Sequence, residues 1–274
     1  MSGARDAVIK PDAHAMAAAM SRLQDWEVAL RGSAGHREAE RLRDAVVDPA
    51  EADAEKVWRV VWDKPLYAAT RVKAAENNIA MLEPHMAGAW ARIGLDATVM
   101  QLSFEGRQDR KDFYRGEGDL FDKARVRPIV AMHRLFRIQS AAQLLRDWVS
   151  VDRERPARHL RSVPLSRLVP KLQGELGRGW GHITVLHLLT DLGLAVKPDL
   201  HLAASVRELG LCDEKVGRVP TLEQAIQINE AVSALSDVFG AGPRALRYTD
   251  KILMEASRQR LFISRQNTQT REAA

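Results

Sequence analysis

Two glycines that flank a tryptophan stand directly before an apolar segment with helical spacing. Gly179, Trp180 and Gly181 are followed by Ile183 and a run of valine and leucine. Glycine permits a tight turn, and the helix that follows presents free backbone N–H groups and the positive end of its dipole at that turn. Such groups bind a phosphate oxygen, directly or through a bridging cation. The spacing predicts a phosphate-binding turn, although a lone G-x-G sequence also fits an ordinary helix-loop-helix turn.

A carboxylate follows the same apolar segment. Asp199 comes after Lys197 and Pro198 and before His201, and the sequence RELGL ends at Leu211. Aspartate after proline at the start of a helix is a good N-cap. An N-cap aspartate can also present its carboxylate to a ligand, so the two roles are compatible.

Residues 176–211 resemble the core of the helix-hairpin-helix DNA glycosylases, the superfamily that includes endonuclease III and 8-oxoguanine glycosylase. The sequence GWGHITV from Gly179 is similar to the family motif G-V-G-x-x-T-A. The segment from Lys197 to His201 is similar to P-V-D-x-H, and RELGL is similar to R-L-G-L. The three motifs occur in the family order. Arg178 departs from the proline that is usual in the family.

The resemblance implies an enzyme of base-excision DNA repair, which hydrolyses the N-glycosidic bond of a damaged or modified base flipped out of duplex DNA. Asp199 would be the catalytic residue, because base cleavage builds positive charge on the sugar and a carboxylate stabilises it while orienting water. Lys197 and His201 would be accessory residues. The resemblance assigns DNA binding to the hairpin residues Gly179, Trp180, Gly181, His182, Thr184 and Arg178.

Ile183 occupies the position at which bifunctional members of the family carry a lysine that attacks the sugar. Isoleucine has no amine, so a monofunctional glycosylase is expected. We expect no cofactor, apart from a monovalent cation that the hairpin could hold. An iron-sulfur cluster needs about four thiolates, and Cys212 is the one cysteine in the chain. The expected partner is double-stranded DNA, bound by a monomer.

Two other interpretations explain part of the same pattern. A non-catalytic helix-hairpin-helix DNA-binding protein accounts for the glycines and the positive charge, with Asp199 only an N-cap. A purely structural or protein-binding helical domain requires all three motif matches to be accidental. The base that is excised, and whether the role is genome repair or action on foreign DNA, are not encoded in these motifs.

Composition sets the wider limits. The 274 residues include 46% hydrophobic and 5% aromatic side chains, and Ala, Leu, Arg and Glu dominate most stretches. This balance favours an all-α fold. The net charge of +5 favours a polyanionic partner without proving one. We expect a cytoplasmic protein without membrane contact, since no segment approaches the roughly 20 apolar residues that span a bilayer.

The expected architecture is two packed helical subdomains with a helix-hairpin-helix DNA-binding motif, similar to a DNA glycosylase. We expect an N-terminal helical region at 1–125, a glycosylase-like core at 126–262 and a disordered tail at 263–274. Polar segments at 104–119 and 150–163 are rich in arginine. Either could follow a phosphate backbone, but their mixed charges favour solvated surface loops. Helical spacing predicts helices at about 11–30, 36–47, 49–62, 65–80, 82–93, 128–149, 164–175, 182–192, 199–209, 221–238 and 242–257.

Overall fold

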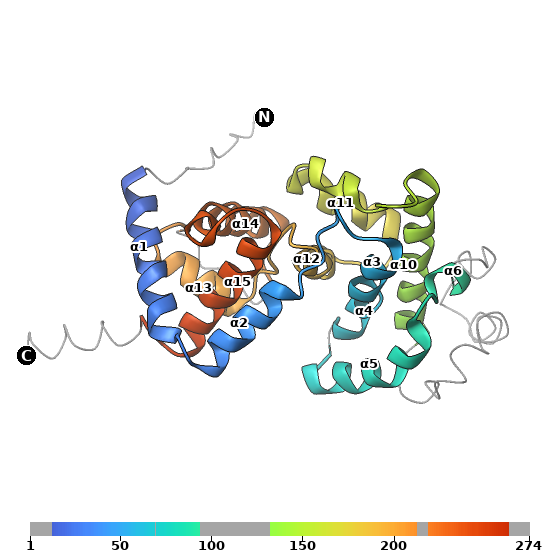
Figure 1. Cartoon of the computed structure of the whole chain (residues 1–274), viewed down its shortest axis with the longest axis horizontal. Coiled ribbons are helices and arrows are strands. Elements are labelled where there is room, and N and C mark those ends of the chain that lie inside the picture. Colours follow the sequence, from blue (N-terminus) through green and yellow to red (C-terminus); the bar gives the residue numbers. More distant parts are fainter. Residues whose placement is uncertain (1–12, 69, 94–131, 213–218, 263–274) are drawn as a thin grey trace, which may run out of the picture. The chain divides into compact units, whose positions relative to one another are not determined.

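The regular elements of the computed structural model are helices throughout the residues that it describes, which are 13–68, 70–93, 132–212 and 219–262 (Figure 1). The expected all-α class is confirmed for these ranges. The chain divides into two compact units. Unit 1 joins Met1–Val46 to Gly193–Ala274, and unit 2 is the continuous stretch Val47–Leu192.

The described helices of the expected core at 126–262 fall into both units, on either side of the boundary after Leu192. The expected boundary at residue 125 lies outside the described residues. The physical reason is that the N-terminal helices pack against the C-terminal helices. Periodicity within a helix reports which face is buried but not which distant helix covers it.

In unit 1, the helix α15 contacts each of the other α-helices. Its neighbours begin at local caps that the sequence encodes. The Ser33 hydroxyl accepts from the backbone N–H of His36 at 3.0 Å, and Thr221 forms a reciprocal capping box with Gln224. The elements are α1 (Ala13–Leu30), α2 (Ala34–Asp44), α13 (Leu200–Glu208), α14 (Leu222–Ser236), the 3-10 helix η2 (Asp237–Phe239) and α15 (Pro243–Arg258).

In unit 2, α10 contacts α3, α4, α6 and α11, and α12 contacts α3, α4 and α11. Trp58 is fully buried and its indole N–H donates to the Met86 carbonyl at 2.7 Å. The elements are α3 (Ala54–Val61), α4 (Lys64–Tyr67), α5 (Val72–Met86), α6 (Trp90–Ile93), α10 (Met132–Val151), the 3-10 helix η1 (Arg158–Ser162), α11 (Leu165–Leu176) and α12 (His182–Asp191).

Three predicted helices have different bounds in the structure. The helix expected at 49–62 begins at Ala54, because Asp53 is its N-cap. The helix expected at 65–80 is interrupted after Tyr67, because Ala68 has an extended backbone conformation that ends α4. The helix expected at 82–93 is divided between α5 and α6, with Gly88 at a φ of +62° between them. Left-handed φ values of this kind end helices and favour glycine.

A buried ion cluster ties the end of α12 to the start of α4. The Lys64 ammonium is 2.7 Å from Asp63 Oδ1 and 2.6 Å from Asp191 Oδ2, and Lys64 is only 3% exposed. Removing one partner of a buried ionic cluster leaves a charge uncompensated. The cluster therefore holds α12, the helix that follows the predicted phosphate-binding turn, against the start of α4.

None of the described helices has the length and apolar character that a membrane span needs. The arginine-rich segment at 104–119 and the tail at 263–274 lie outside the described residues.

Candidate functional site

The predicted turn lies between α11 and α12, and its backbone explains its glycines. Gly177 caps α11 with a φ of +75°, and its N–H donates to the Gln173 carbonyl at 3.0 Å. Gly179 has a φ of +96°, a conformation that side chains with a Cβ rarely adopt. Gly181 is extended and is the N-cap of α12. We refer to residues 177–181 as the hairpin.

The hairpin leaves backbone donors free at the start of α12. Within the described residues, the N–H groups of Gly179, Gly181 and Ile183 donate to no acceptor. The Gly181 carbonyl, in contrast, accepts from the N–H groups of Thr184 and Val185 at 2.9 and 3.1 Å. Unpaired N–H groups at a helix N-terminus, together with the helix dipole, attract an anion.

Trp180 anchors the hairpin to α10. Its side chain is 2% exposed, and its indole N–H donates to the Arg137 carbonyl at 3.3 Å. The Trp180 side chain, which the resemblance assigned to DNA binding, therefore packs inward. Of the other predicted DNA-binding side chains, Arg178 is exposed and His182 and Thr184 are partly buried.

The side chain of Arg137 lies against the hairpin, which the sequence did not predict. A Cβ on Gly179 would come within 2.6 Å of the guanidinium carbon of Arg137. Burial and the positive charge of Arg134 both lower the pKa of Arg137. In the described part of the chain, neither arginine forms an ion pair with a carboxylate. Two partly buried like charges without a counterion make this part of unit 2 favourable for an anion.

Asp199 is the N-cap of α13, as its position after Pro198 predicts. Its Oδ1 accepts from the backbone N–H groups of His201 and Leu202 at 2.9 and 2.8 Å. No hydrogen bond or ion pair among the described residues uses Oδ2. One carboxylate oxygen is thus held by the helix start, while the other remains available to a ligand.

Two contacts fix the segment that carries Asp199 within unit 1. The buried Asn229 side chain bridges both backbone groups of Val196, accepting from its N–H at 2.6 Å and donating to its carbonyl at 3.0 Å. His201 Nδ1 is 3.1 Å from the Ser257 hydroxyl, which ties the first turn of α13 to α15. Lys197, between these contacts, is partly buried.

A second carboxylate of unit 1 interacts electrostatically with Asp199. Asp250 is 1% exposed, and its Oδ2 accepts from Arg247 at 2.6 Å while Oδ1 has no partner among the described residues. Burial raises the pKa of Asp250, and the negative charge of Asp199 raises it further. Sequence spacing gave no indication of Asp250, because nothing local distinguishes it from a surface residue of α15.

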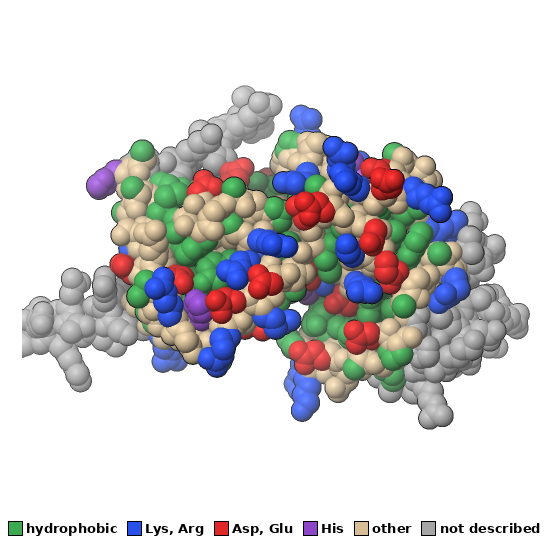
Figure 2. Space-filling model, viewed as in Figure 1, with side chains coloured by type: hydrophobic (Ala, Val, Ile, Leu, Met, Phe, Trp, Pro, Cys, Tyr) green, Lys and Arg blue, Asp and Glu red, His purple; other side chains and the backbone are tan. Residues whose placement is uncertain are grey.

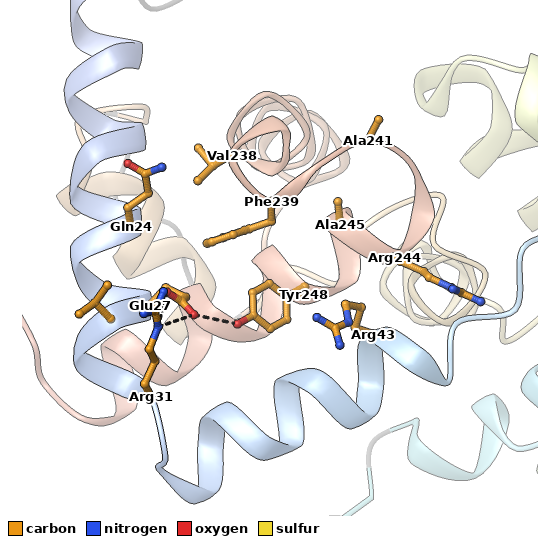
Figure 3. A pocket seen from close by; sticks show the side chains of 11 residues that line it. Gln24, Glu27, Arg31, Arg43, Val238, Phe239, Ala241, Arg244, Ala245 and Tyr248 are labelled. Atoms are coloured by element: carbon orange, nitrogen blue, oxygen red, sulfur yellow. Dashed lines mark hydrogen bonds and ion pairs between the residues drawn. The ribbon is translucent and has the colours of Figure 1, made fainter.

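Unit 1 also contains a hollow of about 600 Å³, which Asp199 does not line. Figure 3 shows side chains of α1 facing Phe239 and Tyr248 across it. Several of its polar groups are already paired: Glu27 accepts from Arg31 at 2.9 Å and from the Tyr248 hydroxyl at 3.3 Å. Burial and the charge of Glu27 raise the pKa of Tyr248 to about 12. These contacts indicate a structural network of α1, α2 and α15 more than a site for a base.

The predicted residues therefore form two groups. The hairpin group, from Arg178 to Thr184, belongs to unit 2, and the group of Lys197, Asp199 and His201 belongs to unit 1. No three His, Cys, Asp or Glu side chains gather as a metal site in the parts of the chain that the structure describes. Comparisons with protein-family models, with curated proteins and with solved structures find no match to this chain.

Proposed function

We propose that the protein is a monofunctional DNA glycosylase, which grips duplex DNA through the hairpin and hydrolyses the N-glycosidic bond of a damaged or modified base. Asp199 is the catalytic carboxylate in this proposal. One observation carries this proposal. Two backbone N–H groups fix Oδ1 of Asp199, while Oδ2 has no partner among the described residues.

The chemistry follows from the charge that develops when the base leaves. The deoxyribose becomes cation-like, and a carboxylate held rigidly beside it stabilises that transition state and orients the attacking water. The two N–H groups at the start of α13 keep the Asp199 carboxylate in one position during the reaction. Ile183, in place of the lysine that the resemblance associates with strand cleavage, supports hydrolysis without a covalent intermediate.

Binding is assigned to the hairpin on independent grounds. Its free N–H groups and the adjacent Arg137 provide donors and positive charge for a backbone phosphate, which fixes the register of the duplex without reading its sequence. A flipped base is required because its glycosidic bond is otherwise inaccessible within the stack.

The experiment uses a panel of duplexes that carry different damaged or modified bases, with alkali added to reveal abasic sites. On the substrate so identified, Asp199→Asn should lower single-turnover base release by on the order of a hundredfold to a thousandfold. The amide still caps α13, so folding and DNA binding should be retained. Strand breaks should appear only after the alkali treatment.

Asp53→Asn is the matched control. Asp53 is also an N-cap, and its Oδ1 accepts from the Lys56 N–H at 2.8 Å. This variant should release base at the wild-type rate. If Asp199→Asn also does so while folded and bound, Asp199 is only a cap.

The second candidate is a non-catalytic helix-hairpin-helix DNA-binding protein. The capping geometry favours it, because the two hydrogen bonds to Oδ1 justify an aspartate at residue 199 without any reaction. It predicts duplex binding that falls steeply with salt, no base release from any member of the panel, and equal behaviour of the Asp199→Asn and Asp53→Asn variants.

A further inference from the structure

The segment between α10 and α11, which its composition predicted to be a solvated surface loop, forms a hydrogen-bonded turn with exposed arginines. Asp152 folds it: its Oδ1 accepts from the backbone N–H groups of Glu154 and Arg155 at 3.1 and 2.9 Å. The Arg158 N–H then donates to the Arg155 carbonyl at 3.0 Å, where the 3-10 helix η1 begins. Pro156 beneath it is buried. We refer to residues 152–158 as the arginine turn.

The arginine turn presents Arg153, Arg155 and Arg158 to solvent. None of the three guanidinium groups forms an ion pair or hydrogen bond within the described ranges. All three line a hollow of about 610 Å³ in unit 2. The turn also contains two carboxylates, Asp152 and Glu154, and Asp152 accepts two hydrogen bonds from the backbone. Three arginines thus converge on one hollow with less negative charge than positive charge beside them.

The base of the hollow is rigid. His159 Nδ1 lies 3.0 Å from the Pro156 carbonyl, and because a carbonyl only accepts, this nitrogen carries the proton. The His159 ring packs edge-on against Trp148, with centroids 5.2 Å apart. Burial lowers the pKa of His159, and the three arginines carry the fixed positive charge of the hollow. A scaffold fixed in this way loses little conformational freedom when the arginines bind an anion.

The overall distribution of surface charge does not distinguish the arginine turn from other parts of the surface. Figure 2 shows basic and acidic side chains interspersed over the visible face of both units. What distinguishes the arginine turn is that three arginines without carboxylate partners line the same hollow, whereas the adjacent Arg161 lies 3.6 Å from Asp48. The guanidinium fork is suited to phosphate oxygens.

We propose that the arginine turn is a second phosphate-binding surface, which binds the backbone of the same duplex that the hairpin holds. This inference rests on the DNA binding in the proposed function. The 3-10 helix η1 and the 12 residues of α11 lie between the turn and the hairpin in the chain, and α11 alone is about 18 Å long at 1.5 Å per residue. That length corresponds to about five base pairs at 3.4 Å each. Within the proposal, a single duplex longer than this contacts both surfaces.

The test compares a triple variant, Arg153→Gln, Arg155→Gln and Arg158→Gln, with wild type. Fluorescence anisotropy measures the Kd for a labelled duplex at salt concentrations from about 50 to 200 mM. Each lost phosphate contact lowers the slope of log K against log salt by about 0.9. The triple variant should therefore lose about two to three units of slope and bind on the order of a hundredfold more weakly at low salt.

The control has the same change in net charge at exposed arginines of unit 1: Arg37→Gln, Arg41→Gln and Arg244→Gln. It should keep the wild-type slope. If wild type and control bind but the triple variant retains the wild-type slope and Kd, the arginine turn is not a phosphate surface and the proposed function stands. If wild type itself does not bind duplex, the proposed function fails as well. Single variants, each expected to lose about 0.9 of slope, replace the triple variant if it does not fold.

Discussion

Replacing Gly179 by alanine should destabilise unit 2 because two features of the hairpin oppose a Cβ at this residue. The backbone φ of +96° is unfavourable for alanine, and the added Cβ would overlap the guanidinium of Arg137, with its carbon at 2.6 Å. Moving the Arg137 side chain aside also has a cost, because this side chain is partly buried.

The two costs have separate magnitudes. An alanine in the left-handed region costs about 1–2 kcal/mol. Inserting a methyl group into an occupied space costs about 1–3 kcal/mol. We therefore expect the free energy of unfolding to fall by about 2–5 kcal/mol. Gly174 is the matched control within α11: it has no positive φ and nothing within 4 Å of an added Cβ, so alanine should stabilise the helix by up to about 1 kcal/mol.

Urea denaturation followed by tryptophan fluorescence measures both variants. A double-mutant cycle with Arg137→Ala then separates the two costs, because removing the guanidinium eliminates the overlap and leaves the φ penalty. Gly179→Ala should cost only about 1–2 kcal/mol in that background. An equal cost with and without Arg137 would refute the packing of Arg137 against the hairpin, and a cost no larger than that of Gly174→Ala would refute the argument altogether.

Two further predictions concern unit 1. Asn229→Ala leaves the buried backbone groups of Val196 unpaired and should lower the free energy of unfolding by about 2–3 kcal/mol in urea denaturation; an unchanged midpoint would contradict it. Burial opposes ionisation of Glu255, but hydrogen bonds and charges from Lys251 and Arg258 outweigh it and hold its pKa below 4.5. Its contribution is therefore present above pH 4.5 and lost as the pH falls further, so acid unfolding of Glu255→Gln should depend less on pH than that of wild type. Parallel stability curves would show that this carboxylate is uncoupled from folding.

The parts of the fold that depend on neighbouring residues could be predicted from the sequence. Apolar spacing located α11, α12 and α13 within one or two residues, and the cap at Asp199 follows from the residue type after Pro198. The glycine turn was likewise predictable, because positive φ at Gly179 is a local requirement.

Contacts between distant segments were not predictable in this way. Arg137 lies 43 residues before Trp180, and Asn229 lies 33 residues after Val196. Each contact depends on which helix faces which, and a single arginine or asparagine on a helix carries no local sign of that partner. The discontinuous unit 1 escaped prediction for the same reason, because helical spacing does not reveal that α2 packs against α15.

The hairpin and the carboxylate are supported by separate sets of contacts. Trp180 and the backbone of α10 hold the hairpin within unit 2, while Asn229 and the start of α13 hold Asp199 within unit 1. Changes at one element should therefore leave the support of the other intact, since sites without shared partners contribute independently. Binding and base release should fail in different variants if the proposed glycosylase function is correct. A DNA-binding protein with Asp199 only as a cap gives no reason for any variant to lose chemistry while it retains the duplex, so this separation is the property that distinguishes the two functions.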